Sequence, residues 1–138
     1  MKTYKGFLKS LPDNGIFCFG SNPEGRHGKG AAATAKMFFG AKYGQGKGLM
    51  GRSYDIITKD LRKSKHPSIS SKEIKQQIVD LYLFAIQNPQ LDFYIVYSGK
   101  GTNLNGYTNE AMARMFSCAE IPSNIIFEEE FSKLLIIN

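Results

Sequence analysis

The sequence predicts an α/β fold in three α/β/α layers, with a mostly parallel central sheet between two layers of helices. Short apolar runs of strand length alternate with longer segments of helical periodicity, and this alternation is typical of parallel sheets covered on both faces. A length of 138 residues is usual for one domain, so we expect residues 1–138 to form a single unit. Hydrophobic residues make up 42% of the chain, which is enough for a folded core.

Short-range signals define the individual elements. We expect strands at residues 4–8 (a short edge strand), 15–20, 53–58, 91–97 and 124–127. Ser70 and Glu73 form a capping box that begins a helix, and Asn88-Pro89 ends it. The apolar residues of this helix follow helical spacing: Ile74, Ile78, Leu81, Tyr82, Ala85 and Ile86. Further helices are expected at 31–39, from Thr108 onward and at 128–135.

The formal net charge of +6 favours polyanionic partners such as nucleotides, phosphates or nucleic acid. The densest basic stretch, residues 59–65, also fits a solvated loop. Cys18 and Cys118 are too few for a disulfide framework; both are expected to be small buried hydrophobes, and no metal-ligand spacing occurs. The N-terminus has no signal-peptide core and no run is long enough to span a membrane, so we expect a cytoplasmic protein with no membrane partner.

Glycine is concentrated in two parts of the chain. Nine of the 14 glycines lie between Gly20 and Gly51, and a second cluster lies within residues 99–106. Each cluster directly follows a predicted strand, and in parallel sheets ligands bind beyond the carboxyl ends of the strands. We therefore expect two glycine-rich loops to face one site.

The first loop, residues 20–32, joins a predicted strand to a predicted helix. Free N–H groups at a helix start suit a phosphate or a hydroxyl-rich sugar, and Gly28 and Gly30 leave room for close approach. The loop lacks the Gly-Lys-Ser/Thr of a Walker loop. A dinucleotide fingerprint would have only the weak substitute Ala33 at its third glycine, and the acidic residue expected about 20 positions further on is missing. The loop is therefore expected to bind a nucleotide without belonging to either of these two motifs.

The second loop, residues 97–107, follows the most apolar predicted strand. Gly99 and Gly101 alternate with other residues, which allows successive N–H groups to turn inward and form an anion nest. Lys100 either adds charge to this nest or points into solvent. Tyr107, at the end of the loop, is either a stacking surface for a ring or ribose or an ordinary core residue.

Four side chains near the predicted strand ends are candidates for contact or chemistry. Ser21 and Asn22 either orient a sugar by hydrogen bonds or serve as turn residues. His27 is either an acid–base group or an exposed loop histidine. Lys59 ends a predicted strand; it is either a nucleophile with a lowered pKa or a surface lysine of the basic stretch.

Taken together, the two loops resemble the macrodomain family, which binds ADP-ribose and its derivatives. The resemblance rests on residues 28–32, on the loop 99–107, and on the Phe-Gly-Ser-Asn and Gly-Arg-His-Gly runs and the tail 122–131 shared with compact bacterial and phage members. It covers nearly the whole chain and implies a single macrodomain-like fold. The expected ligand-binding positions are Gly20, Ser21, Asn22, Arg26, Gly28, Gly30, Ala31, Thr58, Ser98, Gly99, Lys100, Gly101, Thr102, Asn103, Asn105, Gly106 and Tyr107.

The strand end at Lys59 and the following His66-Pro67 are similar to the macrodomain subgroup that removes terminal ADP-ribose from carboxylate side chains. That similarity implies a strand-end lysine, matched by Lys59, and a second-loop aspartate, whose position is taken by Asn105. Asparagine takes no proton near neutral pH, so we expect weak or absent release of ADP-ribose from glutamate-linked protein. Phe7 stands where the family often has an aspartate that contacts adenine, so phosphate and ribose binding are better supported than adenine preference.

Three functions remain open from the sequence. The first is a hydrolase of an ADP-ribosyl ester or of ADP-ribose 1″-phosphate, with Asn22, His27 and Lys59 as candidate catalytic residues. The second is a non-catalytic nucleotide-binding module or ligand sponge, and the third is an RNA-binding protein. The expected partner is an ADP-ribose-type ligand, with ADP-ribosylated protein or nucleic acid as alternatives, and no cofactor or metal is expected.

Overall fold

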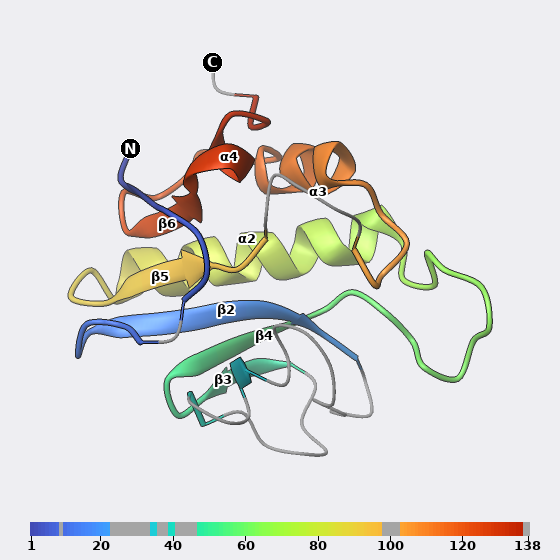
Figure 1. Cartoon of the computed structure of the whole chain (residues 1–138), viewed down its shortest axis with the longest axis horizontal. Helices are drawn as coiled ribbons and strands as arrows, with labels where there is room; N and C mark the ends of the chain where they lie inside the picture. The colour runs from blue at the N-terminus through green and yellow to red at the C-terminus, as the bar shows by residue number, and fades with distance from the viewer. Residues whose placement is uncertain (9, 23–33, 36–38, 41–46, 98–102, 137–138) are drawn as a thin grey trace.

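The computed structural model describes residues 1–8, 10–22, 34–35, 39–40, 47–97 and 103–136, and these form an α/β fold around a six-stranded sheet (Figure 1). The strand order is β1-β6-β5-β2-β4-β3, and every pair of neighbours is parallel except β3 and β4. The predicted α/β class with a mostly parallel sheet is therefore confirmed. The strands are β1 (Thr3–Tyr4), β2 (Gly15–Ser21), β3 (Gly48–Met50), β4 (Ser53–Ile57), β5 (Asp92–Ile95) and β6 (Ile125–Glu128).

Three helices are seen in the described part of the chain: α2 (Ser71–Gln87), α3 (Asn109–Phe116) and α4 (Glu129–Ser132). The predicted caps begin the two longer ones. The Ser70 hydroxyl accepts a hydrogen bond from the Glu73 amide at 3.2 Å, and the Thr108 hydroxyl accepts one from the Ala111 amide at 3.1 Å. None of the described helices is both long and apolar enough to cross a membrane.

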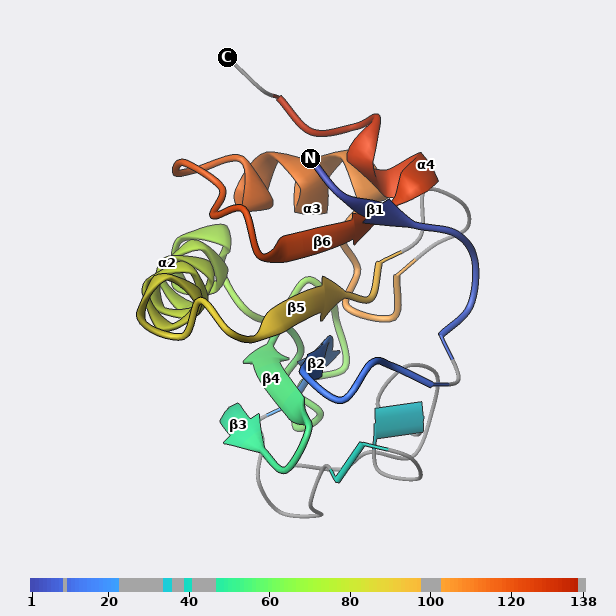
Figure 2. The ribbon, with the colours of Figure 1, turned by 90° about the vertical axis from the view of Figure 1, so that its left-hand side faces the viewer.

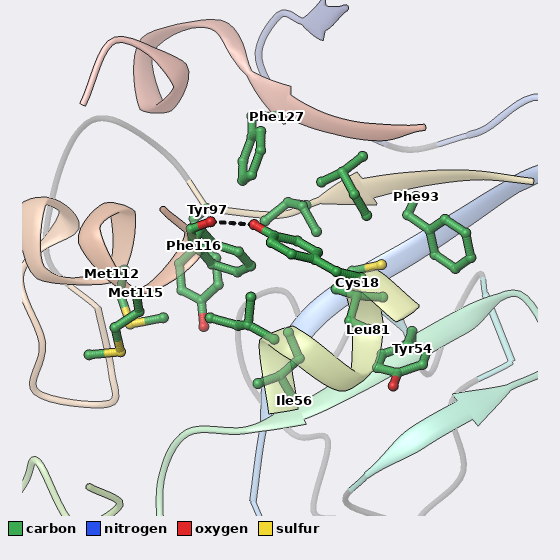
Figure 3. Close-up of a cluster of buried hydrophobic side chains, with 14 of the residues drawn as sticks. Cys18, Tyr54, Ile56, Leu81, Phe93, Tyr97, Met112, Met115, Phe116 and Phe127 are labelled. Carbon is green, nitrogen blue, oxygen red and sulfur yellow. Dashed lines mark hydrogen bonds between the residues drawn. The ribbon is translucent and has the colours of Figure 1, made fainter. Parts of the chain in front are cut away.

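Side chains alternate between the two faces of the sheet along β2, and they are buried on both. Ile16 and Cys18 point to the face covered by α2 and α3, where the main core lies (Figures 2 and 3). Phe17 and Phe19 point to the opposite face and pack there with Ala35 and Phe39; the rings of Phe17 and Phe39 stack with centroids 4.5 Å apart. Cys18 is buried, as predicted.

The helix predicted at 31–39 is described only at residues 34 and 35, which are helical; the rest lies outside the described residues. Strand β3 was not predicted, because its segment is rich in glycine, a composition typical of loops. At its first residue, Gly48, φ is +83°, a left-handed conformation that favours glycine. Helix α4 ends three residues before the predicted position.

Two predicted core residues are exposed. Ile86 keeps 61% of its surface exposed and borders an open cavity of about 680 Å³ together with Met1, Ile121 and Ile125. Cys118 is exposed because α3 ends at Phe116 and the cysteine lies in the turn beyond it. Ala85 in the same turn is fully buried, so Ile86, one residue further round the helix, lies at the edge of the buried stripe.

The sheet topology places two connections at one point of the carboxyl edge. From β2 the chain runs to β3 and β4 on one side of β2, whereas from β5 it runs to β6 on the other side of β5. β2 and β5 are neighbours, so the strand order reverses between them. In open α/β sheets such a reversal leaves a crevice outside the carboxyl ends of the two strands.

Candidate functional site

Buried polar side chains gather at and just beyond the carboxyl ends of β2 and β4. Ser21 ends β2 and Asn22 follows it, and Thr58 and Asp60 follow β4. All four are at most 5% exposed, as is Asn105 in the second loop. Polar groups buried at this density must be held by hydrogen bonds or by a ligand. This edge is therefore the candidate site.

The ends of three elements meet at Gly20. A Cβ atom on Gly20 would lie 2.7 Å from the Tyr97 hydroxyl oxygen and 2.8 Å from Thr58 Oγ1, so only glycine fits there without displacing them. Tyr97 lies just beyond β5 with its ring in the main core (Figure 3). Burial raises the pKa of the Tyr97 hydroxyl to about 12, opposed by the neighbouring Thr58 and Asn105 side chains. This hydroxyl stays protonated at neutral pH.

The carboxyl end of β4 is fixed by a side chain of α2. The Gln77 Oε1 atom accepts a hydrogen bond from the Ile57 amide at 2.7 Å, and the Gln77 Nε2 atom donates to the Ile57 carbonyl at 2.8 Å. Among the described residues, β3 pairs with β4 only as far as Asp55, and Gln77 supplies hydrogen bonds to both backbone polar groups of Ile57. It thereby positions Thr58 and Lys59, the next two residues.

The asparagines of the second loop hold its shape. Asn103 Nδ2 donates to the Tyr107 carbonyl at 2.9 Å and to Asn109 Oδ1 at 3.0 Å. Asn105 Oδ1 accepts from the Tyr107 amide at 2.9 Å, and its Nδ2 contacts Met112 Sδ at 3.6 Å. Asn105 is thus placed at the site edge with both ends of its amide engaged.

The second loop rests on the segment between β4 and α2. Gly106 has φ +87°, and a Cβ there would lie 2.6 Å from the carbonyl carbon of His66. The Tyr107 ring packs against the main core and its hydroxyl donates to the Ile69 carbonyl at 2.6 Å. These are the contacts expected from the core-packing alternative for Tyr107.

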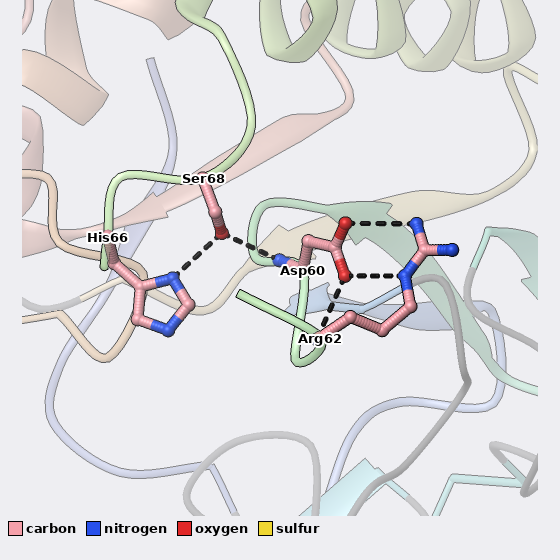
Figure 4. A network of polar contacts seen from close by, with 4 residues as sticks. All are labelled: Asp60, Arg62, His66 and Ser68. Carbon is pink, nitrogen blue, oxygen red and sulfur yellow. Dashed lines mark hydrogen bonds and ion pairs between the residues drawn. The ribbon is translucent and has the colours of Figure 1, made fainter. Parts of the chain in front are cut away.

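A polar network braces that same segment (Figure 4). The Asp60 carboxylate accepts hydrogen bonds at 3.0 Å from Nε, Nη2 and the backbone amide of Arg62, which lower its pKa to about 2. Ser68 Oγ accepts from the Asp60 amide at 2.8 Å and lies 2.7 Å from His66 Nδ1. Residues 61–67 are exposed and include Lys63 and Lys65, so a basic loop stands beside the site.

Asp55 is a buried carboxylate that the sequence did not mark as a functional residue. It lies in β4 with no exposed surface, on the sheet face of Phe19, which is its partner in β2. Burial raises its pKa to about 8, opposed by a hydrogen bond with Ser21. The sequence feature that could have pointed to Asp55 is a single carboxylate inside the predicted strand of residues 53–58.

Of the remaining predicted site residues, only Lys59 lies in the described part of the chain. It is half-buried between the buried Thr58 and Asp60, beyond the end of β4. The other predicted positions lie outside the described residues: Arg26, His27, Gly28, Gly30, Ala31, Ser98, Gly99, Lys100, Gly101 and Thr102.

Within the ranges that the structure describes, no three His, Cys, Asp or Glu side chains are grouped so that they could hold a metal ion.

Comparison of the chain with protein-family models, with curated proteins and with solved structures gave no match in any of the three searches.

Proposed function

We propose that this chain is a macrodomain-like, three-layer domain that binds ADP-ribose or a related nucleotide at the carboxyl edge of its sheet. One observation carries the proposal: the strand order reverses between β2 and β5, and buried polar side chains gather at that edge. The separate cores on the two faces of β2 support the three-layer arrangement.

Two further features favour a phosphorylated sugar ligand over an apolar one. Both glycine-rich loops leave the sheet at this edge, after β2 and after β5. The described groups there include Ser21, Asn22 and Thr58, whose hydroxyl and amide side chains are suited to ribose and phosphate oxygens. The net charge of +6 adds a long-range attraction for an anion.

We propose binding as the main activity and hydrolysis as weak. The second loop carries an amide at Asn105, where a base would be needed, and both ends of that amide are already engaged. Turnover of an ADP-ribosyl ester or of ADP-ribose 1″-phosphate would then depend on water positioned by Asn22 or His27. We expect no covalent ADP-ribose adduct on Lys59.

Isothermal titration calorimetry with ADP-ribose tests this proposal. We expect a dissociation constant in the micromolar range, about −7 to −8 kcal/mol. Gly20→Ala is expected to abolish binding, because its Cβ would displace the Tyr97 and Thr58 hydroxyls. Tyr94→Phe serves as the control on the same chain, since this side chain points to the opposite sheet face from Tyr97. No heat at millimolar ligand would reject the proposal.

The basic loop at residues 61–67 favours a second candidate, RNA binding. Arg62, Lys63 and Lys65 are exposed there, although Arg62 is paired with Asp60. Competition separates the two functions. If RNA displaces ADP-ribose at low salt and the Lys63→Ala/Lys65→Ala double variant no longer binds RNA, RNA binding is favoured. If the affinity of that double variant for ADP-ribose is unchanged, the nucleotide site is favoured.

A further inference from the structure

The Tyr97 hydroxyl has an unusual environment. It is inaccessible to solvent and has no hydrogen-bond partner of full geometry in the part of the chain that the structure describes. The ring that carries it is fixed in the main core, with centroids 5.8 Å from those of both Phe116 and Phe131. The ring therefore cannot swing the hydroxyl out to water.

Stability alone does not account for this hydroxyl. A buried hydroxyl that lacks a hydrogen bond of full geometry adds little to stability, and phenylalanine would fill the same space in the core. A polar group that adds little to folding and lies at the carboxyl edge of the sheet is expected to serve the site instead.

Two polar side chains neighbour this hydroxyl, those of Thr58 and Asn105. The Asn105 amide is already engaged at both ends, which leaves Thr58 as the acceptor. Tyr97 Oη and Thr58 Oγ1 lie within 2.7 and 2.8 Å of the point that a Cβ atom on Gly20 would occupy. Thr58 is 3% exposed and directly follows the strand end that Gln77 fixes. A threonine hydroxyl donates one hydrogen bond and accepts two, so its direction depends on which neighbour donates to it.

We propose that Tyr97 is a positioning residue of the nucleotide site: its hydroxyl donates to Thr58 Oγ1 and so turns the Thr58 proton toward an oxygen of the ligand. The inference rests on the proposed function. The high pKa of the Tyr97 hydroxyl keeps it a donor across the physiological range, which fixes the direction of this relay. The ligand oxygen belongs either to the distal ribose or to the ADP part.

A double-mutant cycle tests the relay. Dissociation constants for ADP-ribose and for ADP are measured by calorimetry for wild type, Tyr97→Phe, Thr58→Val and the double variant, with Tyr94→Phe as the control. We expect each single variant to weaken ADP-ribose binding about tenfold, and the double variant to be no weaker than Thr58→Val alone. Thr58→Ser is expected to restore most of the affinity, because it keeps the hydroxyl.

The melting temperature of the ligand-free protein distinguishes a positioning role of Tyr97 from a purely structural one. Tyr97→Phe is expected to melt at the wild-type temperature or above it. A lower melting temperature, unchanged affinity in Tyr97→Phe, or strictly multiplicative losses in the double variant would overturn the relay. A loss confined to ADP-ribose assigns the oxygen to the distal ribose, and an equal loss with ADP assigns it to the ADP part. A wild type that binds neither ligand rejects the proposed function itself.

Discussion

Replacing Asp55 with asparagine is expected to make the protein's stability less dependent on pH. Asp55 has no exposed surface, and its pKa rises from 3.8 to about 8 because burial disfavours the charged carboxylate; the Ser21 hydrogen bond opposes that rise. In the unfolded chain the same group ionises near its ordinary value. The folded state therefore holds a proton that the unfolded state releases over the interval between the two pKa values.

The size of the effect follows from this proton difference. Below about pH 3 the carboxyl is neutral in both states, and the free energy of unfolding does not depend on it. Between about pH 5 and 7 the folded state binds about one more proton, so stability falls by about 1.4 kcal/mol per pH unit from this group alone. Over that interval the loss is about 3 kcal/mol. Above pH 8 it levels off, since both states are then ionised.

Denaturation in guanidinium chloride at pH 5, 6 and 7 measures this difference directly. Wild type and Asp55→Asn are compared at each pH, so that the contribution of other titrating groups cancels. We expect the stability of the variant relative to wild type to increase by about 3 kcal/mol from pH 5 to pH 7. A constant difference across this range would show that Asp55 is ionised in the folded protein, and the argument from burial would be wrong.

Three further substitutions test the construction of the site edge. Gly106→Ala should cost about 2–4 kcal/mol in guanidinium denaturation, because the residue has φ +87° and the new Cβ would press on His66; a cost below about 1 kcal/mol would contradict the packing of the second loop. Gln77→Leu should cost about 3 kcal/mol in the same assay, because both polar groups of Ile57 lose their partner; wild-type stability would show that another group replaces the amide. Asn105→Asp should keep the hydrogen bond from the Tyr107 amide and gain the ability to release ADP-ribose from glutamate-linked protein. Mass spectrometry of the product measures this release, and an inactive variant would show that a carboxylate at position 105 is not sufficient.

Much of the fold was predictable because its signals are local. The caps at Ser70 and Thr108 depend on a hydroxyl three residues before an amide, a relation that the sequence displays directly. The buried parallel strands are marked by apolar runs that contrast with their flanks. Strand β3 escaped prediction because it is a three-residue edge strand in a glycine-rich segment, stabilised by pairing with β4 rather than by its own composition.

The candidate site was predictable at the level of strand ends but not of side-chain partners. Parallel strands bring their carboxyl ends to one edge, so the meeting of Thr58 and Asn105 near the end of β2 follows from the order of elements. The contacts of Gln77 with β4 and of Tyr107 with the segment before α2 join residues 20 and 38 positions apart. Such pairings depend on tertiary packing, which a single sequence does not encode in any local pattern.

The most direct test of the central claim is a crystal structure of the chain with bound ADP-ribose. We predict that the nucleotide occupies the carboxyl edge between β2 and β5, with Ser21 and Thr58 within hydrogen-bond distance of ribose or phosphate oxygens. Ligand found instead in the open cavity beside Met1 and Ile121, at the opposite end of the sheet, or a carboxyl edge unchanged at saturating ligand, would contradict the proposed site.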